Sequence, residues 1–353
     1  MNTHDTIELL KELIRRPSQS GEEVATADLL ETYLSRNGIR PYRLYNNIYA
    51  HADGFDPERP TLMLNSHHDT VRPAASYTRD PYSPDEVDRR IYGLGSNDAG
   101  ASVVGLVSVF LEYARTPLPF NLLLAISAEE ERSGEHGMRA LLPELGRIDM
   151  AIVGEPTGMQ AAIGERGLVV LDCEAHGRSG HAAHGNGVNA LYIALDDINR
   201  LRNFRFAKSS PLLGDIRMTA TMISAGTQHN TVPDSCRFVV DVRTTDAYTN
   251  EQTVEIIREA LKSDVTPRST RIRASAIDES HPLVRAVKAI GRKTFVSETT
   301  SDMALMPFPT VKMGIGDSMR SHSADEYVMI DEIVEGMDIY RRYIKQIADE
   351  YGH

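Results

Sequence analysis

The sequence predicts an α/β protein in which a second, α+β unit is inserted into a domain built on a central mixed sheet. Three short apolar runs, 61–65, 121–126 and 149–153, are typical of strands buried on both faces of a parallel or mixed sheet. Helical patterns alternate with these runs, as they do in α/β proteins. From residue 166 the strands become longer and alternate apolar with polar residues, and this change marks the inserted unit.

Two helices are expected at the start of the chain. The first has an apolar face that begins at Ile7, and Pro17 prevents it from continuing. The second follows a Ser-x-x-Glu motif that runs from Ser20 to Glu23 and has the form of a capping box. It should end at Gly38, because glycine commonly terminates helices.

The inserted unit has the element order of a ferredoxin-like sandwich: strand, helix, strand, strand, helix, strand. We expect its strands near 171–175, 216–222, 236–242 and 271–276, and its helices over 188–201 and 251–261. The first domain then resumes with a helix over 283–295, a strand over 310–313 and a closing helix over 330–347. The predicted domains are therefore 1–165 with 278–353, and 166–277.

Composition narrows the class of protein. A chain of 353 residues suits two compact units, and its two cysteines, Cys173 and Cys236, fit a reducing cytoplasm. The first residues show no basic segment followed by an apolar stretch, and no window approaches the ~20 apolar residues of a membrane span. The net charge of −12 argues against nucleic acid or an anionic membrane as a partner. We expect a cytoplasmic protein that acts on a small substrate.

Each of the three apolar runs leads directly into acidic or histidine residues. They are His67, then Glu130-Glu131, then Glu155. In open α/β sheets ligands collect beyond the carboxyl ends of strands, so these side chains should meet at one edge. Imidazoles and carboxylates gathered in this way are what a hydrolytic site with two zinc ions requires.

Spacing suggests a division of labour among these residues. Asp69 lies two residues after His67 and can accept the free N–H of that imidazole. Asp98 follows a glycine-rich turn, where a short carboxylate can bridge two cations. Of the adjacent Glu130 and Glu131, one suits a metal ligand and the other a general base. Each motif alone has another interpretation: a polar strand end for His67 and Asp69, a dinucleotide loop for Asp98, and a surface charge run for the glutamates. Their occurrence together favours the metal site.

Two further motifs bear on the chemistry. His322 completes the ligand set, although alone it would be an ordinary polar residue ahead of the last helix. Ser179 does not form a nucleophile elbow, because Gly-x-Ser-x-Gly requires a residue between Ser179 and Gly180. The sequence therefore favours metal-assisted hydrolysis over serine chemistry.

These motifs, in this order along nearly the whole chain, resemble the M20 family of dinuclear zinc peptidases and deacylases. Within that family, the group of acetylornithine deacetylase, acetyl-lysine deacetylase and succinyl-diaminopimelate desuccinylase is most similar. The resemblance implies a zinc-exopeptidase-like catalytic domain, an inserted ferredoxin-like lid and dimerisation domain, and a homodimer formed through that lid. It also implies two Zn²⁺ ions per chain, with Co²⁺ able to substitute.

The resemblance implies a role for each matching residue. One zinc would be held by His67, Asp98 and Glu155, and the other by Asp98, Glu131 and His322. Asp69 would orient His67, and Glu130 would be the general base and acid. In the inserted domain His181 would polarise the scissile carbonyl, in many relatives across a dimer interface. Asn230 and Arg243 would hold the substrate carboxylate, and Arg166 and Thr300 match further substrate-binding positions.

The expected reaction is hydrolysis of the acyl amide of a small N-acyl-L-amino acid. The leading expectation is N-acetyl-L-ornithine, giving ornithine and acetate in arginine biosynthesis. N-acetylcitrulline, N-succinylornithine and succinyl-diaminopimelate stay open as substrates, as does a dipeptidase or aminopeptidase activity. A catalytically silent binding module is disfavoured, because such a protein would have lost ligands that are all present here.

Overall fold

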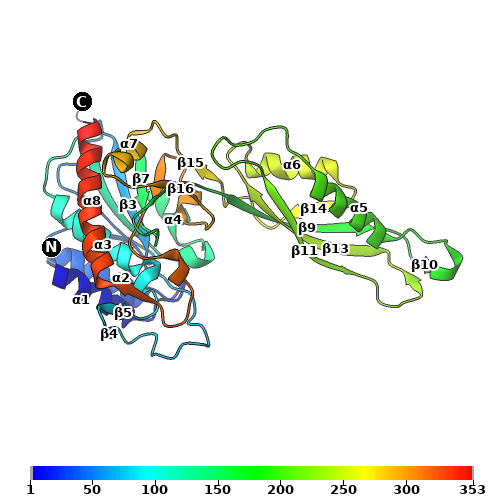
Figure 1. The fold of residues 1–353 in the computed structure, drawn as a ribbon, viewed down its shortest axis with the longest axis horizontal. Coiled ribbons are helices and arrows are strands. Elements are labelled where there is room, and N and C mark those ends of the chain that lie inside the picture. The colour runs from blue at the N-terminus through cyan, green and yellow to red at the C-terminus, as the bar shows by residue number, and fades with distance from the viewer. Residues whose placement is uncertain (1–2, 352–353) are drawn as a thin grey trace. The chain divides into compact units, whose positions relative to one another are not determined.

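The computed structural model describes residues 3–351, and the chain forms two compact units (Figure 1). Unit 1 comprises Met1–Ile163, Ile277–Phe295 and Ser301–His353, and unit 2 comprises Gly164–Ala276 and Val296–Thr300. Unit 2 is therefore an insertion into the sequence of unit 1. Within residues 3–351, no helix combines the length and the apolar character needed to cross a membrane.

A nine-stranded mixed sheet has most of its strands in unit 1. Its order is β1-β2-β6-β3-β7-β17-β8-β15, and β16 pairs with β8. The bounds are β1 Tyr42–Leu44, β2 Asn47–His51, β3 Thr61–His67, β6 Asn121–Ser127, β7 Met150–Val153, β8 Ala161–Glu165, β15 Ser275–Ala276, β16 Thr294–Ser297 and β17 Thr310–Lys312. The three apolar runs are confirmed as β3, β6 and β7, which pair in parallel and are buried at every residue.

Helices cover both faces of this sheet. Their bounds are α1 Thr3–Ile14, α2 Val24–Arg36, α3 Ala101–Tyr113, α4 Met138–Leu141, α7 Pro282–Ala289 and α8 Ile330–Tyr351. On one face α3 packs against β3 and β6, with α8 alongside it (Figure 1). On the other face Met138 and Leu141 of α4 pack among Met63, Leu123 and Ala151. A small sheet of β4 Glu86–Val87, β5 Arg90–Tyr92 and β18 Tyr327–Met329 joins two distant parts of the chain.

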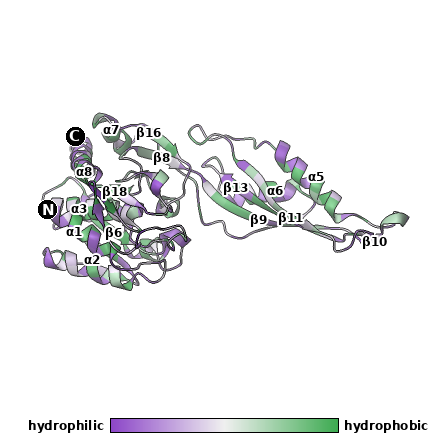
Figure 2. Ribbon diagram, turned by 60° about the horizontal axis from the view of Figure 1, so that its bottom comes forward, coloured by the Kyte–Doolittle hydropathy of each residue, from purple (hydrophilic) through white to green (hydrophobic). Residues whose placement is uncertain are grey.

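Unit 2 is built on a four-stranded antiparallel sheet in the order β11-β13-β9-β14. Its elements are β9 Gly167–His176, α5 Ala190–Asn203, β11 Arg217–Ala225, β13 Ser235–Thr244, α6 Asn250–Ala260 and β14 Asp264–Pro267, with a ribbon of β10 Gly180–His181 and β12 Thr231–Val232. This is the ferredoxin-like arrangement that the element order predicts. Hydrophobic and hydrophilic colours alternate along α5 in Figure 2, and its buried residues Ala190, Ala194 and Leu201 belong to the core of the unit.

The structure corrects the predicted elements in three places after the first two helices. The fourth strand of unit 2 is β14, whereas the predicted strand 271–276 supplies only β15, which pairs with β8 of the large sheet. With a single buried residue, Val265, β14 is too short for its alternation to stand out. The helix predicted over 283–295 ends at Ala289, and Gly291 nearby takes a φ of 77°. The chain then forms β16, and Val296–Thr300 belongs to unit 2 rather than to the first domain.

Candidate metal centre

Three parallel strands of unit 1 bring the candidate ligands together. β3 ends at His67 itself, β6 leads into the helical turn Glu130–Arg132, and β7 ends two residues before Glu155. Because these strands are parallel neighbours, their carboxyl ends meet at one edge of the sheet. The order of the strands thus gathers residues that lie far apart in the sequence.

His67 is the most deeply buried of these ligand candidates, with 1% of its side chain exposed. Its Nδ1 lies 3.1 Å from the backbone oxygen of Asp69 and 3.4 Å from that residue's carboxylate. Its Nε2 lies 3.3 Å from Oδ1 of Asp98 and 3.7 Å from Oε1 of Glu155. An imidazole held at one nitrogen in this way presents the other nitrogen to a cation.

Asp98 presents a different oxygen to each of two histidines. Oδ1 faces Nε2 of His67, and Oδ2 lies 3.7 Å from Nε2 of His322. The same nitrogen of His322 lies 3.0 Å from Oε2 of Glu131. A carboxylate between two imidazoles, with further carboxylates beyond each, would suit a bridge between two cations.

Glu326 fixes the turn that carries Asp98. Its carboxylate accepts the backbone N–H groups of Gly95, Asn97 and Asp98, at 3.1, 2.8 and 2.8 Å. Glu326 is 2% exposed, and this burial raises its pKa to about 7. Sequence reasoning assigns it no role: its position four residues after His322 is the only signal, and the backbone groups it binds lie far away in the chain.

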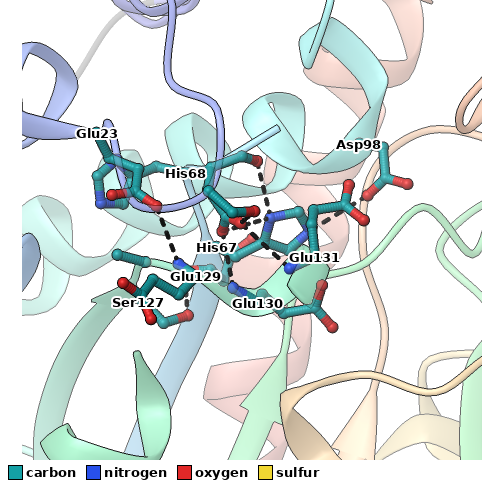
Figure 3. Close-up of polar contacts among 12 residues, drawn as sticks. Glu23, His67, His68, Asp98, Ser127, Glu129, Glu130 and Glu131 are labelled. Carbon is teal, nitrogen blue, oxygen red and sulfur yellow. Dashed lines mark hydrogen bonds and ion pairs between the residues drawn. The ribbon is translucent and has the colours of Figure 1, made fainter. Parts of the chain in front are cut away.

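Asp69 supports the site in two directions. Besides facing His67, its carboxylate accepts the backbone N–H groups of Glu130 and Glu131, at 3.0 and 3.1 Å, and the hydroxyl of Ser20 at 2.5 Å. Figure 3 shows His67, Glu130 and Glu131 gathered around these contacts, with Asp98 to one side. Asp69 therefore couples the orientation of the imidazole to the position of the turn that bears both glutamates.

The donor atoms form two overlapping groups that could each hold a cation: His67 with Asp98 and Glu131, and His67 with Glu130 and Glu155. Within each group these atoms lie within 4.8 Å of one another. The charges favour cations, since carboxylates outnumber imidazoles in a buried space. Burial raises the pKa of Glu155 to about 8 and that of Glu130 well above its usual range. Divalent cations would relieve this repulsion, so the residues present fit a metal centre.

The same excess of negative charge raises the pKa values of the two histidines. Burial lowers the pKa of His67, but Glu155, Asp69 and the carboxylates around them outweigh it and hold that pKa well above its ordinary value. The hydrogen bond to Glu131 raises the pKa of His322 to about 9.

These shifts make the stability of the metal-free protein depend on pH. Glu155 and His322 bind protons more tightly in the folded state than in the unfolded chain, so their stabilising contribution is lost as pH rises toward 8 and 9. Asp69 and Asp98, whose pKa values are lowered, titrate well below this window. Thermal unfolding of chelated protein should show a Tm at pH 8 that is about 2 °C or more below that at pH 6. Zinc-loaded protein should show a smaller change, and a Tm that rises with pH in chelated protein would contradict the expectation.

The remaining predicted site residues belong to unit 2. His181 and Asn230 are adjacent there: His181 pairs with Thr231 in the β10–β12 ribbon, and Ala182 donates its N–H to the carbonyl of Asn230 at 2.9 Å. The side chain of His181 is exposed and accepts the N–H of Ala183.

The two arginines and Thr300 have ordinary surroundings. Arg243 is paired with Asp241 at 2.9 and 3.2 Å, and Arg166 donates to the backbone oxygens of Leu213 and Asp215. Thr300 is half-buried. The part of all five residues in substrate binding stays a prediction.

Imidazoles and carboxylates gathered at the carboxyl edge of a mixed sheet form a candidate metal centre of the kind that metal-dependent hydrolases use. The model of peptidase family M20/M25/M40 matches residues 63–346, and the chain belongs to this family. It is a metal-dependent amidohydrolase, as the sequence resemblance implies.

Curated relatives extend over almost the entire chain. A succinyl-diaminopimelate desuccinylase of Paracoccus denitrificans is 29% identical over 378 aligned positions, which cover 97% of this chain and 98% of the relative. A protein of the same name from a Caulobacter species is 28% identical, and the alignment covers 96% of this chain and 95% of that relative.

Solved structures share the fold. The aminopeptidase PepT of Bacillus cereus matches with a TM-score of 0.78 at 19% identity and covers 99% of both chains. A dinuclear metal-binding peptidase of the M20 family from Bacillus subtilis matches with a TM-score of 0.75 at 15% identity, covering 97% of both chains. At these identities the likeness concerns the fold alone.

Proposed function

We propose that this protein hydrolyses the acyl amide of a small N-acyl amino acid at a pair of zinc ions. The observation that carries the proposal is the position of Asp98, whose two oxygens face His67 and His322 separately. The two curated relatives named above are succinyl-diaminopimelate desuccinylases, and their names support the choice of an acyl amide over other bonds.

The proposed ligand sets follow the distances around the two histidines. His67, Asp98 and Glu155 would hold one ion, and Asp98, Glu131 and His322 would hold the other. Zinc at such a site supplies a Lewis acid that polarises a carbonyl and lowers the pKa of water. The chain's own contribution is to hold both ligand sets rigidly, through Asp69 on one side and Glu326 on the other.

Glu130 is the proposed proton carrier. Its backbone is fixed by Asp69, and its carboxylate belongs to the cluster with His67 and Glu155. Glu130 would take a proton from the water whose oxygen bonds to the acyl carbon. It would return that proton to the amine nitrogen as the carbon–nitrogen bond breaks, so that the products are a carboxylate and a free amine.

Unit 2 brings three arginines near one another, and one of them, Arg243, is paired with Asp241. Arg217 on β11 lies directly opposite Arg243 on β13 in the antiparallel register. Like charges in that position oppose sheet formation, so a functional reason for them is expected. Arg166 lies close enough to Arg217 for their charges to interact. Burial, and after it the charge of Arg217, lowers the pKa of Arg166. These three arginines favour a substrate with more than one carboxylate.

Among the candidate substrates, succinyl-diaminopimelate therefore comes first, ahead of the N-acetyl-L-ornithine that the sequence resemblance favoured. The relatives' names and the arginine cluster both support this order. The test is amine release from succinyl-diaminopimelate, N-succinylornithine, N-acetyl-ornithine, N-acetylcitrulline and simple dipeptides, by chelated enzyme with and without added zinc. Zinc-dependent turnover of one acyl amino acid is expected, and turnover of dipeptides alone would overturn the deacylase proposal.

We further propose that the protein is a homodimer formed through unit 2. The edge strand β11 is exposed along most of its length, and Met222 and Ile223 are 64% and 48% exposed. An edge strand with exposed apolar side chains is a template for pairing with a second chain. Sedimentation equilibrium should give a mass near twice 39.1 kDa. Replacing Met222 by lysine should shift it toward the monomer, whereas a monomeric wild-type protein would refute the proposal.

A further inference from the structure

Glu23 does not serve the helix that its sequence motif suggested. The predicted capping box is wrong: Glu23 is the residue before α2, and no side-chain bond caps the helix. The side chain of Glu23 instead points toward the turn at Glu129, and the residue is 0% exposed. Oε1 accepts the backbone N–H groups of Gly21 and, at 3.2 Å, of Glu129, while Oε2 accepts the side-chain amide of Asn46 at 2.9 Å.

The bond from Glu129 matters because this residue sets the direction of the chain at the metal centre. Glu129 takes a left-handed conformation, with φ 57° and ψ 21°, immediately before Glu130 and Glu131. Non-glycine residues adopt this conformation only where the surroundings hold them in it. The side chain of Glu129 is held too, by Arg132 and by the backbone N–H of His136.

Two buried carboxylates accept hydrogen bonds from three successive backbone N–H groups of this turn. Glu23 accepts the N–H of Glu129, and Asp69 accepts those of Glu130 and Glu131. The two acceptors are linked, because Ser20, three residues before Glu23, donates its hydroxyl to Asp69. Figure 3 shows Glu23 bonded to Glu129 on the side of the turn away from Asp98.

We propose that Glu23 is a positioning residue that aims the carboxylates of Glu130 and Glu131. Without its acceptor, the buried N–H of Glu129 would lack a partner, and the turn would relax toward a more ordinary backbone conformation. Only Asp69 would then hold the turn, through the backbone N–H groups of Glu130 and Glu131. The inference deepens the proposed function and rests on it for the role of Glu130.

The test compares three variants of the full-length, zinc-loaded protein. Glu23→Ala should lower kcat by about 10- to 100-fold with KM changed less than about twofold, as for other supporting residues of metal sites. Glu23→Gln should lower kcat less than Glu23→Ala does. Its amide oxygen can still accept from Glu129, although its amide nitrogen then faces the donor group of Asn46. Asn46→Ala removes the contact to the other oxygen of Glu23, together with a bond from Arg43 at 3.2 Å that lies outside the turn. It is the matched control and should stay near wild type.

A second readout does not depend on activity. Hydrogen exchange of peptides covering 127–134, measured on metal-free protein, should become faster in Glu23→Ala and stay slow in Asn46→Ala. If the wild type turns over none of the panel, the proposed function fails by itself, while exchange still decides the role of Glu23.

A folded, zinc-loaded Glu23→Ala protein with kcat within about twofold of wild type and unchanged exchange would overturn the inference. Should that variant not fold, Glu23→Asp takes its place, because its carboxylate is one methylene too short to reach the turn. Wild-type kcat in Glu23→Asp would overturn the inference equally.

Discussion

Replacing Glu130 by glutamine should lower kcat for the acyl-amide substrate by about 10²- to 10⁴-fold and leave zinc content unchanged. Glutamine has the shape of glutamate and keeps the backbone bond to Asp69, but it cannot accept a proton. The measurements are initial rates and zinc content on the same preparation.

Glu135→Gln is the matched control for this variant. Glu135 lies in the same loop, its side chain is 75% exposed, and it forms an ion pair with Arg139. This control should keep wild-type activity. Near-full activity in Glu130→Gln would remove Glu130 from the proton transfer. Loss of zinc in that variant would instead make Glu130 a ligand, in line with its place in the group of His67 and Glu155.

Replacing Asp98 by alanine should remove both ions, whereas replacing His322 should remove one. The reason is the geometry of Asp98, which faces two histidines, while His322 faces one side of the site only. Both variants should lose activity by about 10²-fold or more, because each would lose a cation that the proposed reaction requires. Zinc per chain after gel filtration distinguishes them.

His136→Ala is the control for nonspecific loss of metal. His136 lies 3.6 Å from Glu129 and its side chain is 53% exposed, outside the ligand groups. It should retain full zinc. Equal zinc loss in Asp98→Ala and His322→Ala would refute the bridging role, and full zinc in Asp98→Ala would place the metal elsewhere.

Much of the site could be predicted because its signals are local. The strands before His67, Glu130 and Glu155 are continuous apolar runs, and parallel strands deliver the residues at their carboxyl ends to one edge. Prediction from apolar patterns is less accurate where a strand is short or where a helix ends before its apolar pattern does. β14 has one buried residue, and the helix that begins at Pro282 ends earlier than its apolar pattern suggests.

The family, the three central strands, the ferredoxin-like order of unit 2 and the candidate ligands follow from patterns along the chain. The contacts of Glu23 and Glu326 are seen only in the folded protein. Both are buried acids whose acceptor oxygens bind backbone N–H groups of distant turns, at Glu129 and at Asp98. Backbone N–H groups are the same in nearly every residue, so no pattern of side chains along the chain marks which carboxylate will accept from them.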